Sequence, residues 1–528
     1  MKRARIVAAV GVLALPVLTA GTAEAQGLRA RDDHYRVRAG KTLDVRHHGV
    51  LANDRLRGPL GSVVRHTAPS HGSVSIDPSG TFRYTPAPGF TGTDSFTYTV
   101  SDAVKLYPAE VPPLATIGGV QIKGGAYGSS LAAVPGSPHE VYGLTDRGPN
   151  VDGPDGGKIE PLPAFTPAIG KFRLDGGKAV PEKVIPLRAA DGTPYSGRVN
   201  TQANTGEKIV DLAGKPLAAD PNGYDSEGLA VQRDGTFWVS DEYGPFITHF
   251  GRDGRAIERL SPFDGSLPKE LANRVPNKGM EGLTLTPDGR TLVGIMQSAL
   301  QQPDLTKKPG NVTTVRIVTV DLATRATREF LYLLDNPKDT KTAVSEITAL
   351  SATRFLVDER DGATQPGAYK KLFEIDLAAA TDAGPRTTAG PYDAAKGGLL
   401  VKGKSVDAYV GTDDTATAAA DLAAAGIKPV SKKLHLDVGA LVSGLDPAGG
   451  FFGHDKIEGV FSPDGGRTVV LANDNDFGID HVTNSAPPYQ LGPKLLPDGR
   501  QDDGEYLVVD TGRLPAATST ATVRITVR

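Results

Sequence analysis

SEGLAVQRDGTFWVSDEYG (226–244) is the first of four stretches of this chain that share one pattern. Each has a Glu at its second position, followed by an apolar run. In most of them an Asp-Gly type of turn comes next. A second alternating run follows and ends in polar, acidic residues. The other three are MEGLTLTPDGRTLVGIMQS (280–298), SEITALSATRFLVDERDG (345–362) and IEGVFSPDGGRTVVLANDNDFG (457–478). Asp-Gly between alternating runs predicts a β-hairpin. Each stretch is therefore expected to supply two neighbouring strands of one repeated sheet.

The spacing of the copies predicts a ring of such sheets. They begin at residues 226, 280, 345 and 457, and a degenerate copy begins at Ile117 (IGGVQI) and ends in VYGLTDRGPN (141–150). One period is thus about 55 residues, and two intervals are about twice as long. The chain also contains 63 Gly and 40 Pro, which favour a turn-rich all-β fold. We expect residues 104–517 to form a β-propeller of six or seven blades, depending on whether each long interval hides a worn copy.

Residues 26–103 show a different pattern of short alternating strands. Turn signals every 8–12 residues predict a β-sandwich. The stretches VLANDRL (50–56) and PSHGSVSIDPSGTFRYTPAPGFTGTDSFTYTVSD (69–102) resemble the bacterial Ig-like, cadherin-like repeat. That family has an acidic loop where this chain has RLRGPLG (55–61), so we expect Asp32, Asp33, Asn53 and Asp54 to cap turns rather than bind calcium.

The last strand of this sandwich is expected at the other end of the chain. In TSTATVRITVR (518–528), Val523, Ile525 and Val527 alternate with polar residues. A propeller whose first and last strands meet in one blade has neighbouring ends and can be inserted into a loop. We therefore expect the propeller to be inserted into the sandwich, or to follow it if the tail is disordered or caps itself.

The first 25 residues resemble a secretory signal peptide. Basic residues precede an apolar run, which ends at the small-x-small site Ala23-Glu24-Ala25. We expect a secreted, extracellular protein without a membrane span. There are no cysteines and the net charge is −3, so thiol chemistry is excluded and no nucleic-acid footprint is visible.

The repeats place carboxylates at equivalent positions. Ring closure should bring Glu227, Glu281, Glu346 and Glu458 together, and the far ends of the hairpins add Asp146, Asp241, Glu242, Asp358 and Asp474. Clustered carboxylates repel one another and call for a cation, and hard oxygen ligands favour Ca²⁺ over Mg²⁺. The predicted metal ligands are Asp146, Glu227, Asp241, Glu281, Glu346, Asp358, Glu458 and Asp474. Alternatively, the repeated Glu residues bond the backbone of the neighbouring blade and only hold the ring together.

Motifs in these repeats resemble the phytase-like esterase domain of secreted bacterial proteins. They are GLTDRGPN (143–150), SEGLAV (226–231), SDEYGP (240–245), KGMEGL (278–283), DERD (358–361), KIEGV (456–460) and NDNDFG (473–478). The resemblance implies a propeller whose acidic residues support phosphoester hydrolysis. The sequence contains no G-x-S-x-G motif, so a serine-hydrolase mechanism is not indicated.

On this basis we expect a secreted, calcium-dependent phosphoester hydrolase acting on a small phosphorylated substrate. The expected catalytic residues are Glu227, Asp241, Glu242, Glu281, Arg147, Arg360 and Lys278. Lys456 is a further phosphate-binding candidate, and His249 and His454 could be general acids or structural residues. Two alternatives stay open: a non-catalytic, calcium-stabilised propeller that binds a ligand or surface partner, and a hydrolase of non-phosphate substrates such as sugar lactones. The Ig-like domain could contact a cell surface or matrix.

Overall fold

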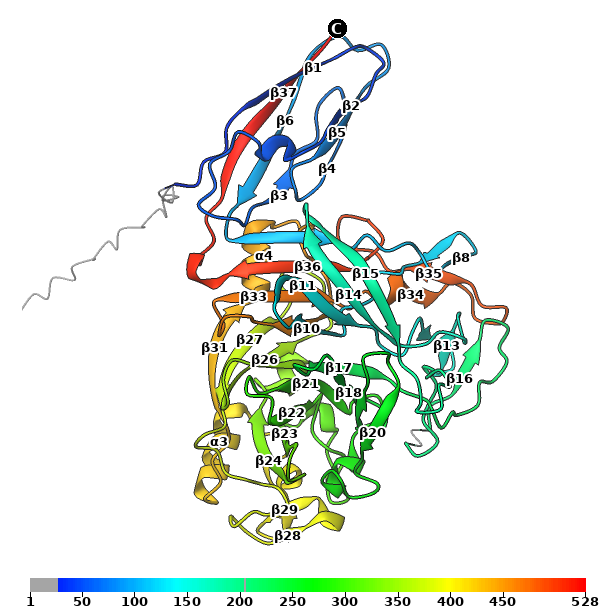
Figure 1. The fold of residues 1–528 in the computed structure, drawn as a ribbon, viewed down its shortest axis with the longest axis vertical. Coiled ribbons are helices and arrows are strands. Elements are labelled where there is room, and N and C mark those ends of the chain that lie inside the picture. Colours follow the sequence, from blue (N-terminus) through cyan, green and yellow to red (C-terminus); the bar gives the residue numbers. More distant parts are fainter. Residues whose placement is uncertain (1–26, 204–205) are drawn as a thin grey trace, which may run out of the picture.

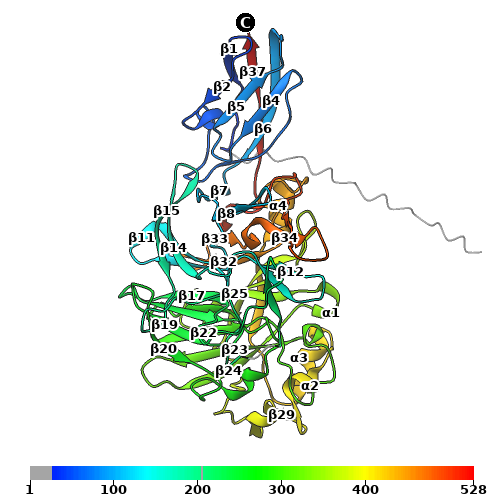
Figure 2. The ribbon, with the colours of Figure 1, turned by 90° about the vertical axis from the view of Figure 1, so that its right-hand side faces the viewer.

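The computed structural model describes residues 27–203 and 206–528 and has two parts, a narrow β-sandwich and a larger set of sheets (Figures 1 and 2). The predicted signal peptide lies outside the described residues. Helix is scarce and short, as the composition predicts: the helices are α1 (Pro337–Thr340), α2 (Val406–Val410), α3 (Thr415–Ala424) and α4 (Val438–Leu445). In the described part of the chain, no helix has the length and apolar character needed to cross a bilayer.

Two sheets form the sandwich. One has the order β1 (Asp33–Val37), β37 (Ser519–Val527), β6 (Gly92–Ser101) and β3 (Ser62–His66); the other has the order β2 (Leu43–Val45), β5 (Phe82–Pro86) and β4 (Gly72–Ile76). Because side chains alternate between the two faces of a strand, the apolar residues of both sheets face one shared core. Tyr84, Tyr98, Val523 and Ile525 are fully buried in it.

The C-terminal strand lies in the middle of the first sheet. β37 pairs antiparallel with β6, with Val523 opposite Phe96, and parallel with β1, with Val523 opposite Asp33. The chain therefore leaves the sandwich after β6, builds the larger part, and returns to complete the sandwich with its last strand (Figure 1).

An ion-pair cluster holds the two crossing segments together. Asp102 is fully buried and binds the Arg57 guanidinium through both oxygens, at 2.7 and 2.8 Å. Arg513, on the returning segment, donates to the Asp102 carbonyl at 2.9 Å. Such a buried, bidentate pair fixes the geometry of the two segments at the junction.

The larger part is a closed propeller. Within the described residues it has five four-stranded sheets, and their innermost strands contact one another in the cyclic order β10, β17, β21, β25, β32 and back to β10. From the axis outward the sheets are β10 (Ser130–Val134), β11 (Ser137–Leu144), β14 (Ala168–Asp175), β15 (Lys178–Pro186); β17 (Ser226–Val231), β18 (Phe237–Asp241), β19 (Ile247–Phe250), β20 (Ala256–Leu260); β21 (Met280–Leu285), β22 (Thr291–Met296), β23 (Thr314–Asp321), β24 (Thr327–Leu333); β25 (Ala343–Ala349), β26 (Arg354–Arg360), β27 (Lys370–Asp376), β31 (Ser431–Asp437); and β32 (Ile457–Phe461), β33 (Thr468–Asn473), β36 (Glu505–Asp510), β7 (Val104–Pro108). The fifth sheet joins both ends of the propeller segment, because β7 pairs with β36 and closes the ring.

The prediction of six or seven blades is therefore wrong, and insertions explain the error. The long intervals between repeats hold small extra sheets, with no further blade among the described residues. The degenerate copy at Ile117 forms the hairpin of β8 (Ala115–Ile117) and β9 (Val120–Ile122), and the first blade begins later, at Ser130. The other inserted strands are β12 (Val151–Asp152), β13 (Lys158–Glu160), β16 (Ile209–Asp211), β28 (Tyr392–Asp393), β29 (Gly398–Val401), β30 (Lys404–Ser405), β34 (Ile479–Val482) and β35 (Leu491–Pro493).

Candidate active site

A β-bulge occurs at or directly beside each repeated Glu. The pairing between the first two strands of a blade shifts register between Ser226 and Leu229, between Met280 and Gly282, between Val344 and Glu346, and between Ile457 and Gly459. A bulge interrupts the strict alternation of side chains and re-aims the residue it contains. The bulge thus leaves Glu227, Glu281 and Glu458 out of their own blade's pairing. In the fourth blade it leaves out Ser345 instead, and Glu346 is paired with Asp358.

The Gly that follows three of these Glu residues lets neighbouring blades approach closely. A Cβ added to Gly228 would lie 2.4 Å from the Leu283 nitrogen, and one added to Gly282 would lie 2.5 Å from the Ile347 nitrogen. These separations are far below van der Waals contact, so only Gly fits. The Glu-Gly pair therefore combines a re-aimed carboxylate with tight contact between inner strands.

A cavity of about 510 Å³ opens at this end of the propeller. Its lining carries twelve acidic and six basic side chains. Ten predicted residues lie in it: Asp146, Arg147, Glu227, Glu242, Lys278, Glu281, Arg360, Lys456, Glu458 and Asp474. The structure therefore brings together most of the residues that the repeats and their strand ends indicated.

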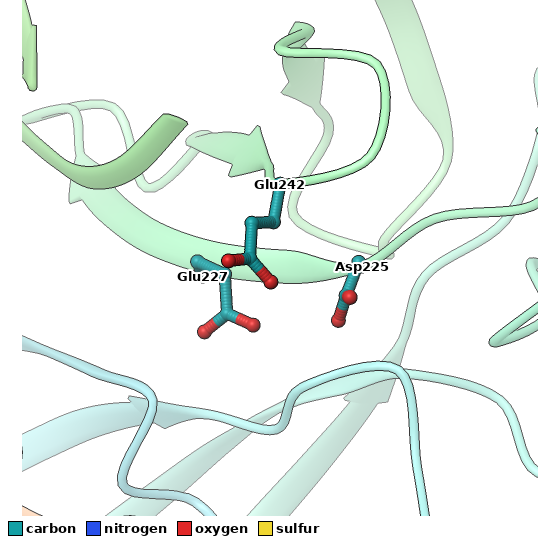
Figure 3. Close-up of side chains that lie close together, drawn as sticks. All are labelled: Asp225, Glu227 and Glu242. Carbon is teal, nitrogen blue, oxygen red and sulfur yellow. The ribbon is translucent and has the colours of Figure 1, made fainter. Parts of the chain in front are cut away.

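Three buried carboxylates form the tightest cluster. Asp225, Glu227 and Glu242 each offer an oxygen, and these oxygens all lie within 4.8 Å of one another (Figure 3). Burial, together with Asp225 and Glu281, raises the pKa of Glu227 well above its usual range; burial, Glu281 and Asp225 do the same for Glu242. Among the described residues, Glu227 has no hydrogen-bond or ion-pair partner for its carboxylate. The cluster lacks sufficient protein countercharge.

Glu281 is linked to the cluster through an amide. Gln297 Nε2 donates to Glu242 Oε1 at 2.9 Å and to Glu281 Oε2 at 2.8 Å, and Lys278 Nζ donates to the Gln297 oxygen at 2.6 Å. Burial and the neighbouring Glu458 raise the pKa of Glu281 to about 8. Lys278 therefore orients the amide that holds two of the carboxylates.

Arg147 forms one wall of the cavity and is nearly inaccessible. Its Nη1 donates to Glu207 at 3.1 Å, its Nη2 donates to Asn150 at 3.2 Å, and its backbone N–H donates to Asp225 at 3.3 Å. Its guanidinium also lies over the Tyr243 ring. Burial alone would lower its pKa, but Asp225 and Glu207 outweigh that effect, so Arg147 stays charged and orients Asp225.

Paired charges from the fourth and fifth blades form another part of the site. Lys456 Nζ lies 3.1 Å from Asp474 Oδ2 and 2.6 Å from Asp476 Oδ1, while Lys494 binds the other oxygen of Asp476 at 2.6 Å. Against the cost of burial, the two lysines lower the pKa of Asp476. Arg360 forms an ion pair with Glu458. Asp474, Asp476 and Glu458 are thus each paired with a cation, whereas no ion pair to Glu227 occurs among the described residues.

Burial raises the pKa of two further acids of the cavity, Asp146 and Asp474. Asp146 lies next to Asp474 and Asp225, and its pKa is raised well above its usual range; that of Asp474 rises to about 7. Asp146 Oδ1 accepts from the Gly148 N–H at 2.8 Å. Simultaneous ionisation of Asp146 and Asp474 is therefore unfavourable.

Three predicted residues do not line the cavity. Asp241 accepts from the backbone N–H groups of Asp225 (2.8 Å) and Gly244 (2.7 Å), so it shapes the loop that presents the cluster. Glu346 accepts from the Leu283 and Ile347 N–H groups and from Ser130, and so ties three blades together. This is the blade-to-blade role that the repeat left open.

The third, Asp358, is buried beside Glu346 on the paired strand. Neither of its oxygens has a hydrogen-bond partner in the described structure, and burial raises its pKa well above the usual range. Asp358 therefore favours the neutral form and does not supply a cavity ligand.

Neither candidate histidine reaches the cavity. His249 stacks on Trp238 with ring centroids 4.4 Å apart, on the outer part of the second blade. His454 is fully buried, with Nδ1 2.9 Å from Asp502 and Nε2 3.0 Å from Glu505. Both histidines therefore have structural contacts.

The His454 contacts predict a pH dependence of stability. Burial opposes protonation, but Asp502 and Glu505 outweigh it and raise the pKa to about 9 from the usual 6.5. Since the pKa is higher in the folded state, the stabilisation is complete below about pH 6.5 and is lost as the pH rises through 9. We expect the melting temperature to fall across this window less steeply in His454→Gln than in the unmodified protein. Parallel melting curves from pH 6 to 10 would rule out this role.

The sequence reading missed several residues that the structure brings to the site. Asp225 precedes the Glu-Gly repeat by one residue, Gln297 ends the corresponding hairpin of the next blade, and Lys494 lies in an insertion. Asp225 directly precedes one repeated stretch and Gln297 lies within another, so their positions in the repeat were the available signal. Lys494 has no counterpart in the repeat pattern.

Comparisons with known proteins bear on both parts of the chain. A family model described as "Esterase-like activity of phytase" matches residues 124–477, and one described as "Bacterial Ig domain" matches residues 26–107. A curated relative from Arthroderma benhamiae, named an uncharacterized secreted protein, is 30% identical over 225 residues, which make up 33% of this chain and 44% of the relative. The chain thus spans less than half the length of that relative.

Solved structures show much weaker likeness. A luciferin-regenerating enzyme has 9% identity and a TM-score of 0.28, over 86% of this chain and 95% of that one. A virginiamycin B lyase from Staphylococcus aureus has 10% identity and a TM-score of 0.25, over 89% of this chain and 98% of that one.

Proposed function

Since the chain belongs to the family described by the esterase-like activity of phytase, which indicates a hydrolase-type activity, we propose that it is a secreted, calcium-dependent phosphoester hydrolase. The observation that carries this proposal is the buried cluster of Asp225, Glu227 and Glu242 in the lining of a charged cavity. Export is proposed from the N-terminal pattern and from the secreted relative.

The donor set of the cluster fits a hard divalent cation. All three side chains offer carboxylate oxygens, their oxygens lie within 4.8 Å of one another, and Glu227 has no protein partner among the described residues. Such ligands suit Ca²⁺ better than a softer metal. When bound there, the cation would polarise a phosphoryl oxygen and lower the pKa of a bound water.

The basic residues supply the complementary half of the proposed site. Lys456 and Arg360 line the same cavity as the cluster and lie beside carboxylates that keep them charged and in place. Lys341 also lines the cavity. In our proposal, Arg360 and Lys456 bind the non-bridging oxygens of the phosphoester and hold it against the carboxylate cluster.

The charge of the lining favours participation of a cation. With twelve acidic against six basic side chains, the cavity would repel a phosphoester if every group were ionised and no cation were bound. Arg147 and Gln297 hold Asp225 and Glu242 in place without neutralising the whole cluster. A bound cation would reduce the repulsion among the carboxylates and would attract an anionic substrate.

A test is to assay purified residues 26–528 on a chromogenic phosphomonoester, a phosphodiester and a carboxyl ester, first with chelator and then with calcium restored. We expect phosphoester cleavage to fall at least about twentyfold in chelator and to recover with calcium. Lys456→Gln should raise KM about tenfold with a smaller change in kcat. Carboxyl-ester cleavage that ignores the chelator would overturn the proposal. Calcium-induced stabilisation without turnover of any substrate would favour the non-catalytic propeller.

A further inference from the structure

The sandwich has a charge opposite to that of the chain as a whole. Residues 27–103 and 517–528 contain twelve Lys and Arg but seven Asp and no Glu, while the whole chain has a net charge of −3. The positive charge is therefore concentrated in the domain that lies apart from the candidate active site (Figure 1).

Three of the seven Asp residues of the sandwich are buried, whereas none of its Lys or Arg residues is. Asp33, Asp94 and Asp102 are buried. Asp94 accepts from two backbone N–H groups and from the Tyr84 hydroxyl, and Asp102 binds Arg57. Most of the Arg side chains, in contrast, are exposed. The surface of the domain is therefore more basic than its composition alone suggests.

The outward side of the sheet β1-β37-β6-β3 combines arginines with hydroxyls. The register aligns His34 with Arg524 and Ser95 in one row, and Arg36 with Thr526 and Thr93 in the next. Arg65 extends the side through its bond to Thr99 at 3.3 Å. At the outward positions of these four strands, the described residues include no Asp, Glu, Phe, Tyr or Trp side chain; Asp32, at the edge, pairs with Arg524 at 2.7 Å.

We propose that this arginine and hydroxyl surface binds a polyanionic polysaccharide. Guanidinium groups bind carboxylate, sulfate and phosphate groups through paired hydrogen bonds. The Ser and Thr hydroxyls lie on neighbouring strands about 4.8 Å apart and can bond the hydroxyls of an extended sugar chain. Charge complementarity selects the anionic polymer.

The composition of the surface also argues against other partners. Neutral sugar rings and unpaired nucleobases are held mainly by stacking on large aromatic side chains, and this surface has no Phe, Tyr or Trp among its described outward residues. The sheet extends away from the propeller toward the C-terminus, so a long chain can lie along it (Figures 1 and 2).

The test compares two variants of the mature chain that lose the same charge. Arg36→Gln/Arg65→Gln/Arg524→Gln removes three arginines from the proposed surface. Lys41→Gln/Arg46→Gln/Arg83→Gln removes three exposed cations from outside it, two of them on or beside the opposite sheet. Binding to dextran sulfate, polygalacturonate, phosphomannan, neutral dextran and duplex DNA is measured at two salt concentrations, with thermal melting to verify that the variants are folded.

We expect at least one acidic polysaccharide to bind, more weakly at high salt, and the first variant to weaken binding about tenfold or more while the second changes it less than about threefold. The polymer that binds most tightly identifies the preferred oxyanion. Equal losses in the two folded variants would overturn the proposal, as would DNA binding that matches polysaccharide binding or no binding to any acidic polysaccharide.

Discussion

Glu227→Gln is expected to remove the calcium-dependent activity and to reverse the order of stability seen without calcium. In chelator, the variant should melt at a higher temperature than the unmodified protein, because one of three crowded, buried carboxylates becomes neutral. With calcium, the unmodified protein should gain stability and the variant should gain much less, since it has lost one ligand of the proposed site. Phosphoester turnover should fall by about 100- to 1000-fold.

Asp480→Asn is the matched control for this experiment. Asp480 lines the same cavity, but its side chain is 64% exposed and lies outside the cluster. Its activity should stay within about threefold of the unmodified protein, because an exposed charge contributes little. A Glu227→Gln protein that is folded, active and still stabilised by calcium would contradict the proposed cation site.

Deletion of residues 517–528 is expected to unfold the sandwich while the propeller stays folded. β37 lies between β1 and β6, so its loss removes the central pairing of the sheet as well as the buried side chains Val523, Ile525 and Val527. Burial of each is worth about 1.5–3 kcal/mol, and the sum is comparable to the whole stability of a typical domain. The propeller keeps its own closure through β7 and β36.

Calorimetry and limited proteolysis distinguish these outcomes. We expect the deletion to remove one thermal transition and to expose residues 27–103 to protease, with the propeller transition retained. Thr526→Ala, an outward position on the same strand, should change the melting temperature little. A sandwich that still resists protease after the deletion would show that β37 is dispensable.

The sequence predicted the fold class but not the number of blades. The hairpin repeats and the sandwich pattern indicated an Ig-like domain with a propeller, and the all-β structure and the family matches confirm this. The blade count was wrong because an interval of double length can hold a blade or an insertion. Which one it holds depends on whether its strands pair beside an inner strand, and that pairing is not a local property of the sequence.

At the candidate site, too, the sequence predicted some residues correctly, while the role of others depended on the tertiary structure. The repeats indicated four equivalent Glu residues, and Glu227, Glu281 and Glu458 do line the cavity. Glu346 has the same position in its repeat but bonds to Leu283 and to Ser130 of the first blade, which has no Glu at this place. Its role was decided by a neighbour that lies far away in sequence.

The sequence by itself determined which segments form strands and turns and which residue types gather at the ends of the hairpins. Period-2 alternation, Asp-Gly turns and Glu-Gly bulges depend only on residues that are close together in the sequence. Tertiary structure alone decided that Asp225 joins Glu227 and Glu242, that Asp241 accepts from backbone N–H groups, and that Lys456 and Lys494 pair with Asp476. Distances between oxygens from different strands and blades depend on ring size and on the bulges that aim each side chain, and these are set only when the ring closes.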